Sequence, residues 1–311
     1  MKIVALAGGV GGAKLVDGLA QLLPPGDLTV IVNTGDDFEH LGLAICPDLD
    51  TVCYTLAGLA NPETGWGRRA ETFNALENIQ TLAGPDWFRI GDKDLATHLE
   101  RTRRLREGQS LSQITRHFCR AWGVHHLVLP MSDQPVHTMV NTLESGELPF
   151  QEYFVHQKCA PQVRGFRFAG IDSAQPAPGV LKEIESAGAV VFCPSNPWVS
   201  IDPILALPGL RSVLAAKTVL AVSPIIAGQT VKGPAAKMYT ELGIQPSALA
   251  VANHYADLLS AFVLDIVDQS MEQEFTIPIK ITQTLMKTRA DRLHLAQDVL
   301  HLIQSLQNTS Q

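Results

Sequence analysis

Residues 2–14 read KIVALAGGVGGAK, and this stretch decides the class of fold. An unbroken apolar run such as KIVALA is typical of a parallel β-strand that is buried on both faces. After the glycines, residues 13–23 carry leucines at helical spacing, and a second apolar run, LTVIVNTG, occupies residues 28–35. A strand, a helix and a second strand in this order form a βαβ unit. The sequence therefore predicts an α/β fold with a Rossmann-like parallel sheet that binds a nucleotide.

Four glycines stand where the first predicted strand meets the helix: Gly8, Gly9, Gly11 and Gly12. A tight turn alone would need only one or two of them. Glycines at such a junction also let the backbone approach a phosphate group, which a helix N-terminus attracts, and Lys14 would add a full positive charge. The stretch is neither a P-loop, which requires Ser or Thr after the lysine, nor a complete G-x-G-x-x-G motif. We expect these five residues to bind nucleotide or phosphate, with a simple turn as the alternative.

The composition is that of a globular chain with an acidic balance. Of its 311 residues, 46% are hydrophobic and 18% are charged, and the formal net charge is −7. An acidic chain is a poor nucleic-acid binder and is repelled by anionic membranes, so we expect neither as a partner. No apolar stretch approaches membrane-spanning length. Five scattered cysteines without C-x-x-C spacing indicate reduced thiols. Together these features predict a soluble, cytoplasmic protein.

Strand signals disappear between residues 49 and 123, where apolar residues recur at helical spacing and Ser110 with Gln113 predicts a capping box. We interpret residues 49–123 as a helical subdomain inserted into a discontinuous nucleotide-binding α/β domain, residues 1–48 and 124–311. Further elements are predicted as strands at 125–132, 190–196, 217–224 and 277–283, a hairpin of 153–157 with 164–171, and a final helix at 288–306.

Four aspartates come soon after the second predicted strand: Asp36 and Asp37 in NTGDD, and Asp48 and Asp50 in PDLDT. In an open parallel sheet, ligands bind beyond the carboxyl ends of the strands. Carboxylates gathered there suggest a magnesium ion shared with phosphate oxygens, and Asp36, Asp37 and Asp50 are the expected metal ligands. The alternatives are structural: a solvated loop for the first pair, and an N-cap of the following helix for Asp50.

Another strand end carries hydrogen-bonding side chains. Ser195, Asn196 and Ser200 follow the apolar run VVFC, which ends at residue 193. Because the carboxyl ends of parallel strands share one edge of the sheet, we expect these three side chains near the glycines, where they would bind phosphate or ribose.

The segment WFRIGDKDLATH, residues 87–98, combines aromatic, basic and acidic residues before and on a helix start. Asp92 is expected to be the N-cap of that helix, with Asp94 in its first turn. For the aromatic pair and for His98, burial in a core is the simpler interpretation. Arg89 and Lys93 are the basic residues that could contact a ligand.

Seven motifs together resemble the 2-phospho-L-lactate transferase family of coenzyme F-420 biosynthesis. They are GGVGGAK, NTGDD, CPDLDT, GWG with a following arginine, WFRIGDKDLATH, SNPWVSIDPIL and SPIIAG. The resemblance runs from Met1 to the last predicted helix. It implies a magnesium-dependent enzyme that uses a guanosine diphospho donor whose terminal phosphate carries lactate or a related acid. The phospho acid passes to the ribityl hydroxyl of the deazaflavin Fo, and GMP leaves. Members of the family are usually homodimers.

The resemblance also implies roles for single residues. An aspartate matching Asp50 and a basic residue of the WF-x-x-GD-x-D block contact Fo; we carry the second role to Arg89, with Lys93 as the alternative. The glycine loop and the SNP segment belong to the guanosine diphosphate side of the cleft. Aspartates would hold the metal and supply a base, and Asp50 and Asp37 are the expected catalytic residues. Such a transfer needs positioning and charge neutralisation more than a covalent nucleophile.

Two other functions fit parts of the sequence. A nucleotide-sugar-binding regulatory protein of the same superfamily would share the fold without transferring anything, but such chains carry a DDGGSSG-like stretch where this one has GDDFEHLGL. A nicotinamide-dependent dehydrogenase would explain the glycines, but not the clustered carboxylates or the helical insertion. Phospholactate, phosphoenolpyruvate and phosphoglycerate all stay open as the transferred acid.

Overall fold

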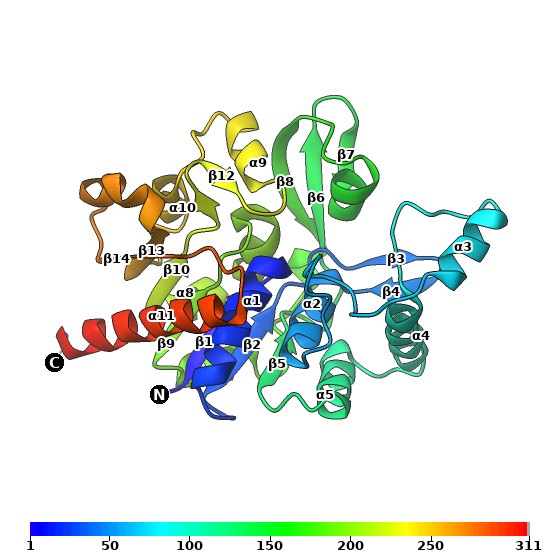
Figure 1. Cartoon of the computed structure of the whole chain (residues 1–311), viewed down its shortest axis with the longest axis horizontal. Coiled ribbons are helices and arrows are strands. Elements are labelled where there is room, and N and C mark those ends of the chain that lie inside the picture. The colour runs from blue at the N-terminus through cyan, green and yellow to red at the C-terminus, as the bar shows by residue number, and fades with distance from the viewer. Residues whose placement is uncertain (310–311) are drawn as a thin grey trace.

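The computed structural model describes residues 1–309 and has a parallel seven-stranded sheet at its centre (Figure 1). The strand order is β14-β13-β10-β9-β1-β2-β5, and every neighbouring pair in it is parallel. The strands are β1 (Ile3–Ala7), β2 (Leu28–Val32), β5 (Leu127–Pro130), β9 (Ala189–Phe192), β10 (Thr218–Val222), β13 (Ala261–Asp265) and β14 (Ile279–Thr282). The predicted α/β class and parallel sheet are confirmed.

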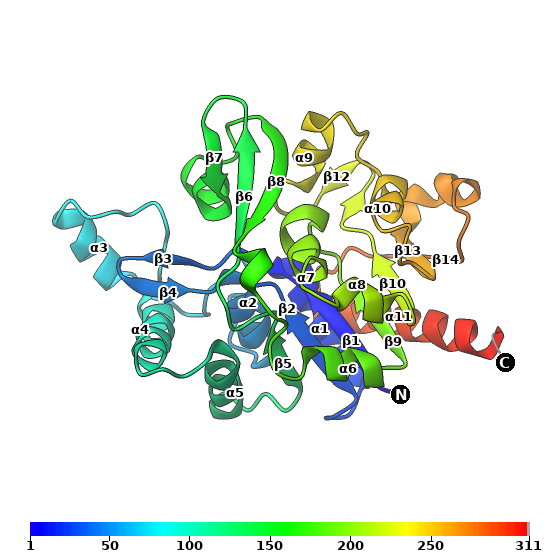
Figure 2. The same ribbon diagram turned by 180° about the vertical axis from the view of Figure 1, so that it is seen from behind.

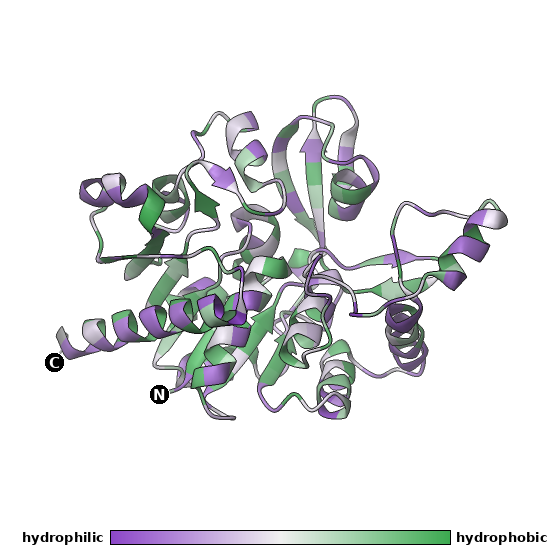
Figure 3. Ribbon diagram, in the orientation of Figure 1, coloured by the Kyte–Doolittle hydropathy of each residue, from purple (hydrophilic) through white to green (hydrophobic). Residues whose placement is uncertain are grey.

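Helices cover both faces of this sheet. One face carries α1 (Gly9–Leu22), α2 (Pro47–Leu56), α5 (Leu111–Ala121) and α11 (Arg289–Thr309), and the other carries α6 (Val180–Ser186), α7 (Asp202–Leu205) and α8 (Leu210–Leu214) (Figures 1 and 2). Alternate residues of each strand point to opposite faces. Accordingly Ile3 and Ala5 enter the core under α1, whereas Val4 and Leu6 enter the core on the opposite face. The central strands are strongly hydrophobic and the outer surface of α11 is largely polar (Figure 3).

The chain reverses its direction of travel across the sheet at β1. From β1 it proceeds to β2 and β5 on one side, and it later returns to β9 on the other side of β1. The carboxyl ends of β1 and β9 therefore form a topological switch point, the place where ligands bind in open α/β sheets. The glycines after β1 and the SNP segment after β9 meet there.

Helices α2 and α5, together with α3 (Asn74–Thr81) and α4 (Asp92–Arg106), occupy the region in which helices were predicted. A short hairpin of β3 (Phe38–His40) and β4 (Leu43–Ile45) leads toward α3 and α4 at one side of the molecule (Figure 1). The capping box of Ser110 and Gln113 is present at the start of α5. Leu49 of α2 and Leu111 of α5 lie in the same core as α1, and the division into two domains stays a prediction.

A three-stranded sheet stands beside the central one. It consists of β7 (Gly146–Pro149), β6 (His137–Thr142) and β8 (Val163–Ala169), joined by antiparallel pairs. The predicted hairpin of 153–157 with 164–171 is wrong: residues Glu152–His156 form a π-helical turn, and β8 pairs with β6 instead. The helical turn stacks the ring of Phe154 on that of Phe150, four residues earlier, which a strand would not do.

The remaining elements are short. They are β11 (Ile225–Ile226), β12 (Gln229–Thr230), α9 (Ala235–Glu241), α10 (Ala248–His254), a π-helix at Pro197–Ile201 and 3₁₀ helices at Ile171–Ser173 and Ile266–Glu274. Strand β13 was not predicted. Among the described residues, no helix has both the length and the apolarity to cross a membrane.

Candidate active site

A cleft of about 770 Å³ lies at the carboxyl ends of the central strands. Ten of the thirteen residues predicted to bind or react line it: Gly8, Gly9, Gly11, Lys14, Asp36, Asp50, Arg89, Ser195, Asn196 and Ser200. Asp48 lines it as well. The other three, Gly12, Asp37 and Lys93, lie outside its lining. Residues from both ends of the chain therefore converge on one site, as the fold rule predicts.

The glycines pack against the segment that follows β9. A Cβ atom at Gly11 would lie 2.3 Å from the carbonyl oxygen of Pro194, and one at Gly12 would lie 2.8 Å from Oγ of Ser195. The hydroxyl of Ser195 donates to the carbonyl oxygen of Gly8 at 2.8 Å and accepts from its N–H at 3.2 Å. These glycines thus allow the close approach of two strand ends that builds the floor of the cleft.

Gly9 is the glycine with room for a ligand. It begins α1 with a φ of +60°, and a Cβ there would meet nothing nearer than Oδ1 of Asp48 at 3.8 Å. Its N–H donates to that carboxylate at 2.7 Å, and Asn33 donates to the other oxygen at 2.9 Å. Burial raises the pKa of Asp48 to about 6, against these two bonds. Asp48 therefore occupies a helix N-terminus where a phosphate group would otherwise be attracted.

The carboxylates of Asp36 and Asp37 are buried with few hydrogen-bond donors around them. Burial raises the pKa of both carboxyls well above the usual range, and the neighbouring Asp48 adds to the effect at Asp36. Within the described part of the chain, Oδ1 of each is buried without a hydrogen-bond partner. Buried carboxylate oxygens of this kind are the hard ligands that magnesium prefers.

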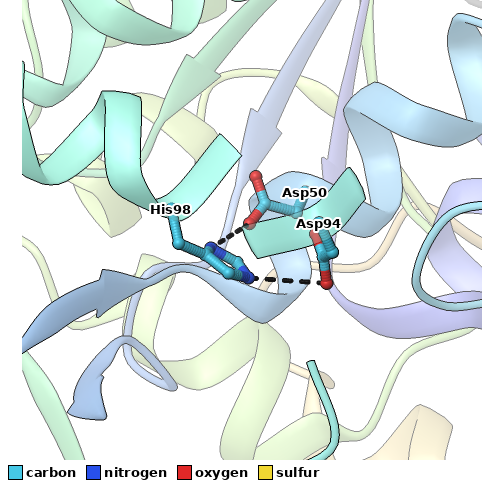
Figure 4. A group of neighbouring side chains, drawn as sticks. All are labelled: Asp50, Asp94 and His98. Atoms are coloured by element: carbon cyan, nitrogen blue, oxygen red, sulfur yellow. Dashed lines mark ion pairs between the residues drawn. The ribbon is translucent and has the colours of Figure 1, made fainter. Parts of the chain in front are cut away.

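Asp50 is the centre of a buried ionic cluster with His98, Arg101 and Asp94. Figure 4 shows the ion pairs of His98 with Asp50 and Asp94. Arg101 donates to Oδ1 of Asp50, while Nδ1 of His98 lies 3.7 Å from Oδ2. No described residue hydrogen-bonds Oδ2. Burial raises the pKa of Asp50, and the charge of Arg101 opposes that rise. One oxygen of the carboxylate is thus held, and the other is buried without a hydrogen-bond partner in the part of the chain that the structure describes.

Asp50 is not a helix cap. Helix α2 begins at Pro47, with Cys46 as its N-cap, and the N–H of Asp50 already donates to the carbonyl oxygen of Cys46. The expected structural role is therefore wrong, because the proline at the first helical position starts the helix one turn earlier.

The interpretation of Asp92 also changes. The N-cap of α4 is Gly91, and the Asp92 carboxylate instead accepts from the N–H groups of Asn74 and Ala75 at the start of α3. Glu71 in turn accepts from two N–H groups at the start of α4. The beginnings of α3 and α4 are therefore capped across the loop between them, and Asp94 lies in the first turn as predicted.

The two basic residues considered for the Fo role differ in position. Arg89 lines the cleft, with its guanidinium 4.6 Å from the ring centroid of Phe73. Lys93 lies outside the lining, and its ammonium donates to the carbonyl oxygens of Arg69 and Ala70. The geometry favours Arg89 as the residue that faces a ligand.

Lys14 is partly committed to the fold. Its ammonium donates to the carbonyl oxygen of Met286 at 2.7 Å, and burial, followed by the charge of Arg292, lowers its pKa.

The polar residues after β9 also have contacts within the fold. Asn196 accepts from the N–H of Trp198 and caps the π-helix. Ser200 is buried against Gly8. These two residues and Lys14 still face the cleft.

An aromatic wall closes another side of the cleft. Trp87 and Phe88, expected in a core, line it together with Tyr54, Phe150 and Phe154. The ring of Trp87 packs edge-on to that of Phe88 at 5.7 Å and stacks on His156 at 5.1 Å. The cleft therefore offers aromatic surface to a flat apolar ligand and carboxylates to a charged or metal-bound one.

Sequence reasoning missed Arg101 and gave His98 no role in a site. A signal was present, because residues 94, 98 and 101 recur at intervals of four and three and so share one face of α4. Asp50, Asp94 and His98 also form a group of described residues whose ligand atoms lie within 4.8 Å of one another. Lys158 and Lys232 also line the cleft, and they were not predicted because neither lies in a recognisable motif.

A parallel sheet with a polar cleft at its switch point and buried carboxylates is the arrangement of an α/β enzyme that binds its ligand at the carboxyl ends of the strands. The sequence model of the family "2-phospho-L-lactate transferase CofD" matches residues 3–304, so the chain belongs to that family of transferases.

Similar proteins with curated names are transferases as well. A phosphoenolpyruvate transferase of Streptomyces griseus is 46% identical over 281 residues, which cover 88% of each chain. One of Thermobifida fusca is 47% identical over 86% of this chain and 87% of its own. A 2-phospho-L-lactate transferase of Methanosarcina mazei is 40% identical, covering 88% and 90%. Among solved structures, a UPF0052-family protein of Bacillus halodurans superimposes with a TM-score of 0.64, covering 96% of this chain and 98% of its own; at 14% identity, it supports the fold alone.

Proposed function

We propose that this transferase moves a 2-phospho acid from a guanosine diphospho donor to the ribityl hydroxyl of the deazaflavin Fo. The observation that carries the proposal is the unoccupied oxygen of Asp50. It lies in a cleft that offers aromatic side chains on one side and the N-terminus of α1 on another. The flat ring of Fo fits the aromatic wall, and the diphosphate fits Lys14 with the polar residues Ser195 and Asn196 after β9. The diphosphate is placed there because Asp48 already takes the first N–H of α1.

The reaction is one displacement at phosphorus. The ribityl oxygen of Fo forms a bond to the donor's terminal phosphorus, the bond from that phosphorus to the bridging oxygen breaks, and GMP leaves. The hydroxyl proton passes to Oδ2 of Asp50, whose raised pKa suits a proton acceptor. Arg89 and Lys14 hold phosphoryl oxygens in line for the displacement. Asp37 is a second candidate base, although its side chain lies outside the lining.

Asp36 and Asp37 would hold magnesium, because their unpartnered oxygens fit a hard cation. Asp50, also expected as a metal ligand, keeps Oδ2 for the proton in this proposal. When bound, the ion would neutralise the developing charge on the phosphoryl oxygens. His98 and Asp94 form an alternative pair of ligands with Asp50. A nitrogen ligand favours softer metals than magnesium, so we assign the ion to the aspartates.

Phosphoenolpyruvate is the acid we propose first for the donor. Relatives that bear its name are 41–47% identical to this chain, and the one named for phospholactate is 40% identical. Phospholactate and phosphoglycerate are the other candidates.

A homodimer, also implied by the family resemblance, would be seen as a doubled mass in light scattering.

Mass spectrometry of the products tests the proposed function. The enzyme is mixed with Fo, magnesium and each guanosine diphospho acid in turn, and we expect GMP together with Fo enlarged by the phospho acid. Binding of the donor without any product would instead favour a regulatory protein that binds nucleotides. Tighter binding of nicotinamide dinucleotides than of GDP in calorimetry would favour the dehydrogenase alternative.

A further inference from the structure

Arg101 is the largest fully buried side chain among the described residues, with 1% of its surface exposed. It does not line the cleft. Its guanidinium donates to Oδ1 of Asp50, to the carbonyl oxygen of Ala44 at 3.2 Å, and toward Nδ1 of His98 at 3.2 Å. One side chain on α4 therefore joins strand β4, helix α2 and its own helix at a single point.

These contacts fix the orientation of the Asp50 carboxylate. Because Arg101 takes Oδ1, the carboxylate cannot rotate without losing a charge-assisted bond, and Oδ2 is left without a hydrogen-bond partner among the described residues, 3.7 Å from Nδ1 of His98. Arginine is always a donor, so Nδ1 of His98 accepts its bond and the ring proton sits on Nε2. That nitrogen faces the Asp94 carboxylate at 3.4 Å, which accepts from Tyr54 at 2.7 Å.

We propose that Arg101 is a positioning residue for the transfer reaction, which aims Oδ2 of Asp50 at the reacting hydroxyl and holds His98 in one tautomer. This inference rests on the proposed function. An ion pair buried this deeply is weak evidence for stability alone, because apolar residues of equal volume often replace such pairs without loss. Its geometric consequence, one oxygen held and one free, is specific to the reaction.

The test uses three variants of the full-length enzyme. Arg101→Met removes the charge and keeps most of the volume; Arg101→Lys keeps a charge but cannot reach three acceptors at once. The matched control is Arg104→Lys, on the same helix, whose ion pair with Glu100 does not touch Asp50. Circular dichroism melting and GDP calorimetry establish that each variant is folded before rates are measured.

We expect kcat to fall about 10–100-fold in Arg101→Met, the range seen when a supporting contact of a reacting group is lost. KM for the guanosine donor should change little, Arg101→Lys should recover part of kcat, and Arg104→Lys should match the wild type. The decisive readout is a double-mutant cycle with Asp50→Asn. If Arg101 acts through Asp50, Arg101→Met will cost little further rate in that background.

An equal loss of kcat in both backgrounds would overturn the inference and leave Arg101 as a structural residue. So would a folded Arg101→Lys variant with wild-type kcat. Should Arg101→Met fail to fold, the cycle is run with Arg101→Lys. A wild-type enzyme that transfers nothing would refute the proposed function instead, so the two failures are distinguishable.

Discussion

Four aspartates in and beside the cleft differ from three aspartates on the outer helices in the direction of their pKa shifts. Burial raises the pKa of Asp36, Asp37, Asp48 and Asp50. Asp94, which also lines the cleft, is the exception, because against its burial the contacts with His98 and Tyr54 lower its pKa. On the outer helices, hydrogen bonds hold the pKa of Asp92 at about 2, and bonds from backbone N–H groups lower that of Asp291. Burial works against Asp298, yet bonds from Thr282 and Lys280 bring its pKa below the usual value.

The direction of the pKa shift distinguishes aspartates that stabilise the fold from aspartates that serve a functional site. A carboxylate that gains several donors on folding stabilises the fold. A buried carboxylate that gains too few destabilises it, and groups perturbed in this way gather at functional sites. On this basis the outer aspartates need no ligand, whereas the cleft set needs a cation, a substrate hydroxyl or both.

The largest effect should come from removing divalent metal. With excess chelator, we expect transfer to fall to the background rate and to return with magnesium or manganese, because the cleft aspartates otherwise repel the donor's phosphates. Magnesium should also raise the melting temperature of the wild type more than that of Asp36→Asn. Full turnover in chelator would take metal out of the mechanism.

The packing of the glycine loop predicts the next effect. Ala in place of Gly11 would put Cβ 2.3 Å from the Pro194 carbonyl oxygen, and such overpacking costs about 1–3 kcal/mol. The melting temperature should fall by several degrees, at about 2–4 °C per kcal/mol, and GDP should bind more weakly. Gly165→Ala is the control, because no atom lies within 4 Å of a Cβ there. Equal melting of the two variants would remove the packing argument.

Neutralising one aspartate from each region should shift stability in opposite directions. Asp36→Asn removes a buried charge beside Asp48, so in metal-free buffer at pH 8 we expect the melting temperature to rise by about 2–4 °C. Asp298→Asn loses the ion pair with Lys280 and should lower it. Differential scanning calorimetry measures both; shifts of the same sign would break the comparison between the regions.

The smallest effect concerns acid stability at the cap of α3. The pKa of Asp92 is about 2 in the folded chain against a usual 3.8. Its contribution is therefore present above pH 4 and is lost as the pH falls from about 4 to about 2. Melting temperatures across this range should decline more steeply for the wild type than for Asp92→Asn. Parallel curves would mean that the carboxylate adds nothing as a cap.

Much of the fold was readable because its signals are local. The apolar run at 2–7, the leucine spacing of α1 and the capping box of Ser110 each depend on neighbouring residues alone. The sheet edge then brings Asp36, Asp50 and Ser195 together by topology. The π-helical turn at 152–156 was wrongly predicted as a strand. A run this short contains too few residues to distinguish helical from strand periodicity.

The ionic cluster was harder to predict because it depends on distant packing. Arg101 lies about fifty residues from Asp50 in the chain. Its spacing from Asp94 and His98 places it on their face of α4 but does not show which element that face meets. The role of Asp92 was missed for a similar reason, since its partners lie on a different helix. An ion pair or cap that joins two different helices can be identified only once the positions of both helices in the fold are known.

The most direct test of the account is the transfer rate of Asp50→Asn, measured beside its melting temperature and its affinity for GDP. The asparagine oxygen can still accept from Arg101, so the fold should lose less than the about 3–5 kcal/mol of breaking a buried pair outright. Loss of the charged oxygen should nevertheless lower turnover by about 10²–10⁴-fold, with GDP binding retained. A stable variant with nearly normal turnover would contradict the account, and the reacting carboxylate would then have to be sought at Asp36 or Asp37.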